Sequence, residues 1–379
     1  MCEENMEREK PKLEGEESLL KFVSTASVAR DMLEIMEKTG TEKMSYVSGQ
    51  GGEDGNVDYL EWSTNTHKSF LHDSDKVMEA FYHHCHLSGP TLCAFYSPTP
   101  SQISTRLQNL LASLKTHPII VPSSDPASLP EIITYTSLQR LISASLYRPI
   151  LLFPSLANVL LSLEARNGSA FIDLVSAFGM REPFTCECTS CQNGLPSPET
   201  EDQEATDDAM AAVMCSDGGP MNDTISEFKT YAETLMHGAK AAGAVNAETR
   251  MLCAGWNIKP KFRFTGPFKT HTPHPILYIA NHADNVTPLR SAKANSANFP
   301  ASVVLVLEAF GHTSLAAPSL CVARETGLFG ERREERSVGG GGGVWEKRGD
   351  DERDKELGDA TWGLMMNYDV RDSGFGRGV

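Results

Sequence analysis

Two stretches decide the fold of this chain: PILYIANHADNVTPL, residues 275–289, and SVVLVLEAFGHTSL, residues 302–315. Residues 275–281 are almost wholly apolar, which is typical of a parallel strand that is buried on both faces of its sheet. Residues 302–307 are a second run of the same kind. Each run ends in a polar segment, so the sequence predicts two buried strands that are followed by loops.

The segment between the two apolar runs has the signals of a helix. Thr287 is suited to the N-cap position and Pro288 to the first helical position. Pro300 would stop the helix, so we expect it to run to about Phe299. A strand, a helix and a parallel strand in this order form the βαβ unit of an α/β fold.

Asp284 and His312 stand just past the two predicted strands. Catalytic and binding groups of open α/β sheets collect at the carboxyl ends of strands. An aspartate there can fix the tautomer of a neighbouring histidine, which then acts as a general base. Taken alone, an aspartate after a strand is often a turn former or a helix cap. A Gly-His pair after a strand is equally weak evidence for a catalytic role. Their order and shared βαβ unit favour the catalytic interpretation.

Helical patterns dominate much of the remaining chain. The apolar spacing predicts a helix over residues 27–39, which Gly40 ends, and residues 41–47 read as the start of a strand. From about residue 73 to residue 257 the pattern is mainly helical. The clearest predicted helices there are residues 101–116, 137–147 and 155–166, and one that the capping box Thr224/Glu227 opens and that runs to about Ala242. Residues 196–208 read as an acidic surface loop.

Composition excludes several classes of function. The chain has 379 residues, 40% of them hydrophobic and 22% charged, which is typical of a globular protein. Its formal net charge of −16 argues against binding nucleic acid or an anionic membrane through a general basic surface. We expect no membrane span, because no stretch approaches the roughly 18 apolar residues required. The first 17 residues show no signal peptide.

The region 253–324 resembles a known family. FTGPF (264–268), HPILYIANHADNVTPL, FPASVVLVL and GHTSLAAPSLC resemble the C-terminal domain of tripeptidyl-aminopeptidase-like α/β-hydrolases, which are serine exopeptidase-type enzymes related to prolyl aminopeptidases. The resemblance implies that Asp284 and His312 are the acid and base of a catalytic triad. It also implies a peptide or small-ester substrate and a helical cap over the site. Neither a cofactor nor a metal ion is expected.

The resemblance also covers earlier parts of the chain, but the nucleophile is missing. Residues 23–47 resemble the helix and strand that lead into the family's nucleophile elbow, and residues 54–70 and 83–100 resemble the start of its cap. Where the family has G-x-S-Y-G, a helix and another strand, this chain passes from Val47 to Asp54-Gly55 within a few residues. Ser48 lies near the right place but lacks the two flanking glycines that the strained turn requires.

The resemblance implies an α/β fold with a partial α/β-hydrolase sheet and a large inserted helical cap, lacking the N-terminal strands and the nucleophile-elbow segment. The expected divisions are a charged segment 1–16, a core fragment 17–60, the cap 61–255, a TAP-like core 256–325 and a disordered tail 326–379. This chain departs from the sequence pattern of the family in abrupt steps, which suggests faulty exon joining as a hypothesis. We therefore expect a serine exopeptidase by family that is catalytically impaired in this chain. The alternative is a non-catalytic remnant that binds a peptide or a partner.

Cysteines and glycosylation sequons indicate a secretory ancestry, which the absent signal peptide contradicts. Without a signal peptide the chain would be cytoplasmic by default, although members of the family are often secreted. In an oxidising compartment we expect disulfides Cys85–Cys93 and Cys215–Cys253. The remaining features are the cluster Cys186, Cys188 and Cys191, interpreted as disulfides or a loop rather than a metal site; sequons at Asn167, Asn222 and Asn285; and His83, His84 and His86, interpreted as surface histidines.

Overall fold

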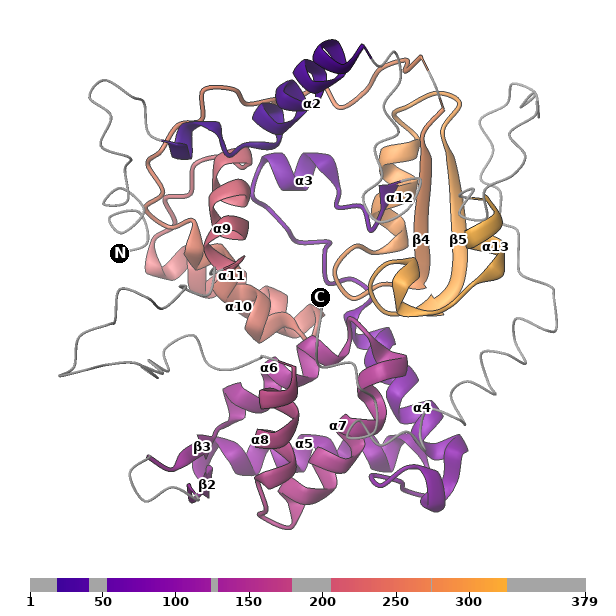
Figure 1. Ribbon diagram of the computed structural model, residues 1–379. Coiled ribbons are helices and arrows are strands. Elements are labelled where there is room, and N and C mark those ends of the chain that lie inside the picture. Colours follow the sequence, from indigo (N-terminus) through magenta and orange to yellow (C-terminus); the bar gives the residue numbers. More distant parts are fainter. Residues whose placement is uncertain (1–18, 41–52, 124–128, 179–205, 274, 326–379) are drawn as a thin grey trace.

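The structure has a small parallel sheet with one helix against it, beside two groups of helices (Figure 1). The computed structural model describes residues 19–40, 53–123, 129–178, 206–273 and 275–325. In chain order the elements are η1 Leu19–Phe22, α2 Thr25–Thr39, β1 Glu53–Asp54, α3 Tyr59–Ser63, α4 Ser74–Leu92, α5 Pro100–Thr116, β2 Ile119–Val121, β3 Glu131–Ile133, α6 Tyr135–Ser145, α7 Pro149–Glu164, α8 Ser169–Ala177, α9 Thr206–Asp217, α10 Ile225–Gly238, α11 Gly243–Leu252, β4 Leu277–Ala283, α12 Leu289–Ser296, β5 Val303–Phe310, η2 Ser314–Ala316 and α13 Leu320–Glu325.

Several predicted features lie outside the described residues. These are Ser48 with the strand expected at 41–47, the cluster Cys186, Cys188 and Cys191, the charged segment 1–16, most of the acidic loop 196–208 and the tail 326–379.

The sheet consists of three strands in the order β1-β4-β5, and both neighbouring pairs are parallel. The strands predicted at 275–281 and 302–307 are confirmed as β4 and β5, although β4 begins and ends two residues later than expected. Tyr278, Ile279 and Ala280 are consecutive and buried, so both faces of β4 are covered. Helix α12 covers one face, where Tyr278 and Ala280 pack with Ala292.

The helix between these strands differs from its prediction at both ends. Pro288 is the N-cap of α12, and Thr287 lies outside the helix because its hydroxyl group bonds to the side chain of Asp284. The helix ends at Ser296 rather than Phe299. Its end is stabilised by the Ser302 hydroxyl, which donates a hydrogen bond to the Ser296 carbonyl oxygen at 2.9 Å.

Helices α4 to α8 form the lower group in Figure 1 and enclose most of the apolar core. The apolar stripe predicted for α5 is confirmed, because all five of its members are buried: Ile103, Leu107, Leu110, Leu111 and Leu114. Helix α6 begins two residues before its prediction. Helix α7 begins at Pro149 instead of residue 155, because Pro154 lies inside the helix rather than before it. Pro154 donates no backbone hydrogen bond, and burial of Phe153 and Leu156 offsets that loss.

The sequence patterns missed a short hairpin in the helical region. Strands β2 and β3 pair in antiparallel fashion, with Ile119 opposite Ile133 and Ile120 opposite Ile132. Ile119 and Ile133 are buried, whereas Ile120 and Ile132 are exposed. Three residues are too few for this alternation to be recognised in the sequence.

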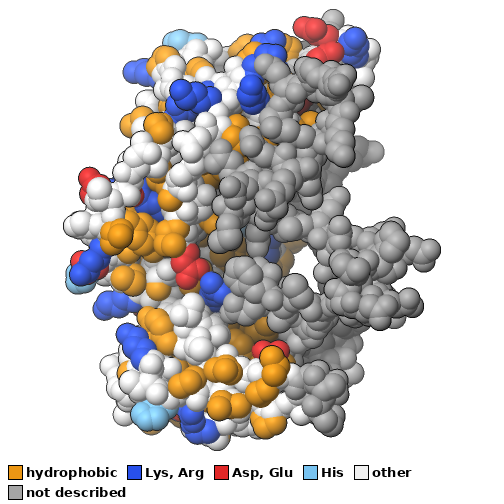
Figure 2. Space-filling model, turned by 90° about the vertical axis from the view of Figure 1, so that its left-hand side faces the viewer, with side chains coloured by type: hydrophobic (Ala, Val, Ile, Leu, Met, Phe, Trp, Pro, Cys, Tyr) orange, Lys and Arg blue, Asp and Glu red, His pale blue; other side chains and the backbone are white. Residues whose placement is uncertain are grey.

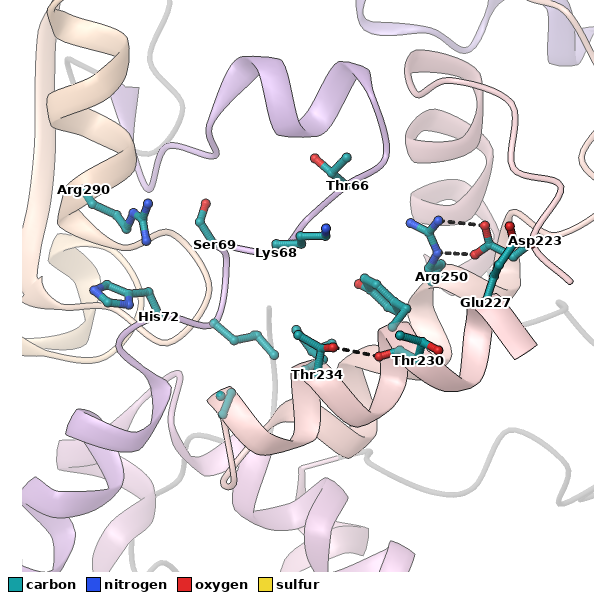
Figure 3. Close-up of a pocket in the computed structure, with 15 residues that line it drawn as sticks. Thr66, Lys68, Ser69, His72, Asp223, Glu227, Thr230, Thr234, Arg250 and Arg290 are labelled. Atoms are coloured by element: carbon teal, nitrogen blue, oxygen red, sulfur yellow. Dashed lines mark hydrogen bonds and ion pairs between the residues drawn. The ribbon is translucent and has the colours of Figure 1, made fainter. Parts of the chain in front are cut away.

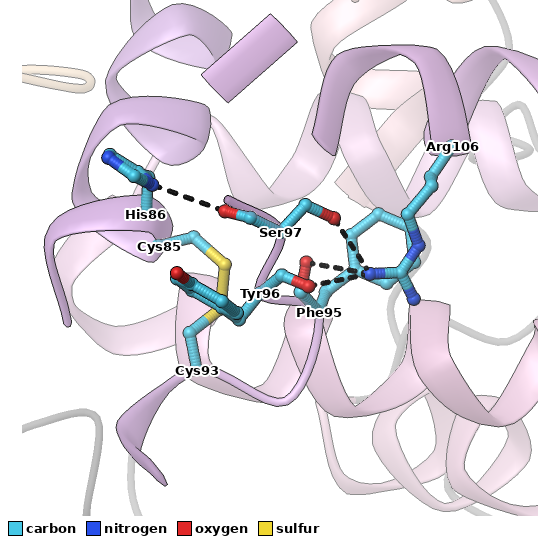
Figure 4. The surroundings of a disulfide bond; sticks show 7 residues. All are labelled: Cys85, His86, Cys93, Phe95, Tyr96, Ser97 and Arg106. Carbon is cyan, nitrogen blue, oxygen red and sulfur yellow. Dashed lines mark hydrogen bonds between the residues drawn. A yellow bond between two sulfur atoms is a disulfide. The ribbon is translucent and has the colours of Figure 1, made fainter. Parts of the chain in front are cut away.

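Two disulfides confirm the predicted cysteine pairs, Cys85–Cys93 and Cys215–Cys253. The first closes the turn between α4 and α5, and next to it His86 Nδ1 lies 3.1 Å from the Ser97 carbonyl oxygen (Figure 4). His86 therefore packs at the surface of the helical region.

Arg106 holds the same turn from the other side (Figure 4). Its guanidinium donates hydrogen bonds to the carbonyl oxygens of Phe95 and Tyr96 at 3.3 and 2.8 Å, and it forms an ion pair with Glu164. The disulfide and Arg106 together fix how the chain passes from α4 into α5.

The three sequons differ in accessibility. Asn167 and Asn222 are exposed, so their side chains can be reached from solvent. Asn285 is only 1% exposed, so it is unsuited to glycosylation of the folded chain. Two of the three sequons thus remain candidates for modification.

Helix α2 leaves much of its predicted apolar face uncovered. Its boundaries agree with the prediction to within two residues, and Gly40 ends it with φ at 66°. Val28 and Ile35, two members of that face, are nevertheless 48% and 56% exposed. Apolar side chains are also exposed elsewhere, and Figure 2 shows them in several groups on one face, among scattered Lys and Arg side chains.

Among the helices that the structure describes, none has the length and apolar character needed to cross a bilayer. The described residues also contain no group of three or more His, Cys, Asp or Glu side chains arranged to hold a metal ion.

A buried histidine makes the stability of the fold sensitive to acid. The ring of His67 lies 5.7 Å from that of Trp62 and 4.7 Å from that of Phe70. Burial lowers the pKa of His67 to about 4, and the positive charge of Arg250 acts in the same direction. In the unfolded chain the pKa is about 6.5, so between these values the unfolded state binds more protons. Stability should therefore fall as the pH falls from about 6.5 to about 4, by about 3 kcal/mol in total.

His67→Phe tests this expectation, because phenylalanine keeps the aromatic packing but cannot bind a proton. Urea unfolding at pH 7 and pH 4.5 should show a smaller difference in free energy of unfolding for this variant than for the parent chain. His271→Phe, at an exposed histidine, should leave that difference unchanged. Equal pH dependence in the parent and His67→Phe would show that another group is responsible.

Candidate active site

The carboxylate of Asp284 lies in the turn that follows β4, and its side chain is 1% exposed. Its Oδ1 atom accepts hydrogen bonds from the backbone N–H groups of Val286 and Thr287 at 2.9 and 2.8 Å. Its Oδ2 atom accepts from the Thr313 N–H at 2.9 Å. Bonds to residues two and three positions ahead are a pattern that aspartate favours. These bonds hold the carboxylate in one orientation.

His312 lies just past the end of β5 and faces this carboxylate. Its Nδ1 atom is 3.2 Å from Asp284 Oδ1 and 3.1 Å from Oδ2. Because an ionised carboxylate only accepts hydrogen bonds, Nδ1 carries the proton and Nε2 keeps a free lone pair. The imidazole is 25% exposed, so Nε2 can act as a base towards a group at the surface.

Thr287 is a third member of the site that sequence reasoning placed elsewhere. Its hydroxyl group donates to Asp284 Oδ2 at 2.8 Å and lies 3.1 Å from His312 Nδ1. The prediction that Thr287 caps the next helix is therefore wrong. Its position three residues after Asp284, within reach of the same carboxylate, is the signal that would have suggested this role.

The end of β1 supports the loop that carries the histidine. Asp54 is buried, and both of its oxygens lie 3.0 Å from the Ser314 backbone nitrogen, while the Ser314 hydroxyl donates to Oδ2 at 2.6 Å. Burial raises the pKa of Asp54, and the hydrogen bonds from Ser314 oppose that shift.

Gly55 packs directly on the same loop with φ at 82°. A Cβ atom at this position would lie 2.8 Å from Thr313 Cγ2 and 3.1 Å from His312 Cε1. The Asp-Gly pair seen in the sequence thus holds the loop with its first residue and leaves room for the imidazole with its second.

A short segment between α6 and α7 contacts the histidine loop from the helical region. The ring of Tyr147 meets that of His312 edge to face at 5.2 Å, and the His312 N–H donates to the Tyr147 carbonyl oxygen at 3.1 Å. Arg148 Nη1 donates to the His312 carbonyl oxygen at 2.8 Å. Pro149 packs against Gly311. The helical region therefore takes part in holding the imidazole in place.

Asn281 fixes the loop from beneath, inside β4. Its Nδ2 donates to the carbonyl oxygens of Gly311 and Thr313, both at 2.7 Å, and its side chain is fully buried. These bonds lie on either side of His312, so they hold the backbone of the residue between them.

The structure does not bring a nucleophile to His312 within the part of the chain that it describes. No serine, threonine or cysteine side chain there makes a hydrogen bond with Nε2, and Ser48 lies outside the described residues. The arrangement is thus an oriented acid–base pair that can accept and return a proton.

In α/β-hydrolases the triad acid precedes the histidine along the chain, and Asp284 precedes His312 in the same order here. Residues 239–329 match the family model described as TAP-like protein. The matched region contains α11, β4, α12 and β5, and it is a TAP-like α/β-hydrolase C-terminal domain. A search of curated proteins found none that matches this chain.

Proposed function

We propose that this chain is a serine exopeptidase-type α/β-hydrolase by descent, in which Asp284 and His312 are the acid and base of the triad. The buried carboxylate that fixes the protonated Nδ1 of His312 carries the proposal. This pair has the geometry in which imidazole serves as a general base. The TAP-like match supports the hydrolase family, and the peptidase type extends it.

In the proposed reaction a serine hydroxyl attacks the carbonyl carbon of a peptide bond near the N-terminus of the substrate. His312 Nε2 takes the hydroxyl proton as the new C–O bond forms and then returns it to the departing amine as the C–N bond breaks. Asp284 stabilises the imidazolium between these steps. Water then cleaves the acyl-enzyme with the same assistance from His312.

We propose further that the chain as written does not complete this reaction. The sequence contains no G-x-S-x-G, and the structure shows no hydroxyl group bonded to Nε2 among the residues it describes. Without the elbow serine, the covalent step of the family's reaction is missing.

A fluorophosphonate probe, which labels activated serines, tests this inactivity. We expect the native chain to incorporate no more label than the same chain after heat denaturation. The control is His312→Ala, which removes the base and should label equally weakly. Stoichiometric labelling of the native chain that His312→Ala abolishes would overturn the inactivity proposal and reveal a working nucleophile. Sequencing the transcript across the codons for residues 47–54 is a separate test, which shows whether an elbow is encoded there.

A non-catalytic role in binding is the second candidate. Among the described residues no hydroxyl group bonds to His312 Nε2, and the Asp284–His312 pair lies next to a folded helical region, which favours this role over a different enzymatic activity. Cooperative unfolding together with peptide binding, in the absence of turnover, would support this role. Unfolding without cooperativity would contradict it.

A further inference from the structure

Helix α2 is attached to the rest of the structure through its first two turns. The Thr25 N–H donates to Asp217 Oδ1, at the end of α9, at 2.8 Å. The hydroxyl of Ser24, the N-cap, donates to the Phe262 carbonyl oxygen at 2.5 Å, and the Arg30 guanidinium lies 4.4 Å from the centroid of the Phe262 ring. Figure 1 shows the helix at the outer edge of the molecule.

The apolar side chains of α2 form a stripe that remains largely uncovered. Val28, Met32, Ile35 and Met36 follow one another at intervals of four, three and one residues, so they lie on one face of the helix. Val28 and Ile35 are 48% and 56% exposed, and the two methionines are half-buried. Single exposed apolar side chains are ordinary, whereas a contiguous apolar stripe is typical of an interaction surface.

The spacing of this stripe is that of a coiled-coil seam. Val28 and Ile35 are seven residues apart, and Met32 lies four residues after the first and three before the second. Asp31 and Lys38 are also seven residues apart, and they flank the seam on the same side of the helix. Both side chains are exposed, so a second helix can reach them.

The charges beside the seam favour one orientation of a helix pair. In an antiparallel pair like flanks meet, so Asp31 of one copy faces Lys38 of the other, and two-fold symmetry makes this contact twice. On the opposite flank Ala29 then meets Met36, and both are apolar. In a parallel pair unlike flanks meet, so the two charged side chains would face apolar ones. The antiparallel pair is therefore the complementary one.

Neither the local charges nor the existing contacts oppose such a pair. Helix α2 carries three acidic and two basic side chains, so it is nearly neutral in a chain of net charge −16. Lys38 Nζ lies 4.0 Å from Glu34 Oε1, but both side chains are more than 70% exposed. Exposed ion pairs of this kind contribute little, so Lys38 can also contact a second carboxylate.

The pocket beside α10 and α11 differs from this stripe (Figure 3). Its walls include Leu71 and Leu235, which are only 2% and 7% exposed, so little of their apolar surface remains to be covered. Asp223 in the same pocket accepts hydrogen bonds from Arg250 Nε and Nη2 at 2.5 and 3.0 Å. The stripe of α2 therefore offers more uncovered apolar surface than these leucines do.

We propose that two copies of this chain associate through α2, as an antiparallel helix pair related by a two-fold axis. Ile35 of each copy packs against Met32 of the other, Val28 lies opposite Thr39, and ion pairs of Asp31 with Lys38 flank the seam. A helix of this length spans only about 22 Å, so the interface is small and association depends on concentration. The pairing involves no group of the hydrolase site.

Sedimentation equilibrium of the full chain over a wide range of concentration tests the proposal. The average mass should rise from that of one chain towards that of two. Ile35→Ser should weaken association by at least about ten-fold, because each copy loses a buried apolar side chain. Ile225→Ser, at an isoleucine of α10 that is 90% exposed, is the matched control and should change nothing. A parent chain that stays monomeric, or equal association of the parent and Ile35→Ser, would overturn the proposal.

Charge reversal tests the orientation of the pair. Asp31→Lys and Lys38→Asp each place like charges opposite one another, so each variant alone should associate about ten-fold more weakly than the parent. An equal mixture of the two variants should associate as the parent does, because every lysine then faces an aspartate across the seam. Circular dichroism checks that both variants keep the parent fold.

A mixture that associates no better than the separate variants would contradict the antiparallel pair, as would variants that associate like the parent. Failure of these measurements leaves the labelling test of the hydrolase proposal unaffected, since that test depends on His312 and not on α2.

Discussion

Replacing Asp284 with alanine is expected to lower the free energy of unfolding by about 3–5 kcal/mol, the largest effect of any single change considered. The carboxylate is 1% exposed and accepts three backbone N–H bonds, the Thr287 hydroxyl bond and the His312 Nδ1 bond. Alanine would leave those donors without an acceptor in a site that water reaches poorly. Urea denaturation at pH 7 measures the loss.

Asp58→Ala is the matched control. Asp58 accepts two backbone N–H bonds, from Leu60 and Glu61, both at 3.0 Å, but it does so as an N-cap in a partly exposed position. Its removal should cost about 1 kcal/mol. Equal losses for the two variants would mean that the buried network around Asp284 contributes no more than an ordinary helix cap.

Asp284→Asn separates the charge from the shape. Its amide can keep one acceptor oxygen, but its NH₂ group faces the donors of Thr287, Thr313 and His312. We expect a loss of about 2–3 kcal/mol and a changed imidazole tautomer, visible in nitrogen-15 NMR of His312. An unchanged tautomer would contradict the role of the carboxylate in fixing the proton on Nδ1.

Gly311→Ala is expected to lower the free energy of unfolding by about 3–4 kcal/mol, because backbone strain and steric overlap add. Gly311 has φ at 104°, and a Cβ atom there would lie 2.5 Å from Pro149 Cδ and 2.9 Å from Ala316 Cβ. The position joins the histidine loop to the helical region, so an added methyl group has to displace one of them. Chemical denaturation again measures the loss.

Gly40→Ala provides the comparison, since Gly40 has φ at 66° but no atom within 4 Å of an added Cβ. This variant should lower the free energy of unfolding by only about 1 kcal/mol, because backbone strain acts there without any steric overlap. Pro149→Ala removes the nearest obstacle, so Gly311→Ala should cost less in that background than in the parent chain. Equal costs in both backgrounds would show that the contact with Pro149 is not the cause.

Local sequence patterns predicted those parts of the molecule that depend on neighbouring residues. The apolar runs before Asp284 and His312 predicted two buried parallel strands and placed both residues past their ends, because continuous burial leaves a continuous apolar sequence. The stripe from Ile103 to Leu114 predicted α5 for a similar reason. The prediction failed for two residues that take another local role. Thr287 bonds to Asp284 instead of capping α12, and Pro154 lies inside α7 instead of preceding it.

Contacts between distant segments were decided only by the tertiary structure. Asp54 bonds to Ser314 across 260 residues of chain, and Arg148 bonds to the backbone of His312 across 164. No periodicity encodes such pairs, because each partner satisfies its own local pattern equally well without the other. By itself, then, the sequence determined the α/β class and the positions of Asp284 and His312 past the ends of two strands. Folding determined which side chains hold them, because hydrogen bonds and burial depend on distances in space that separation along the chain does not specify.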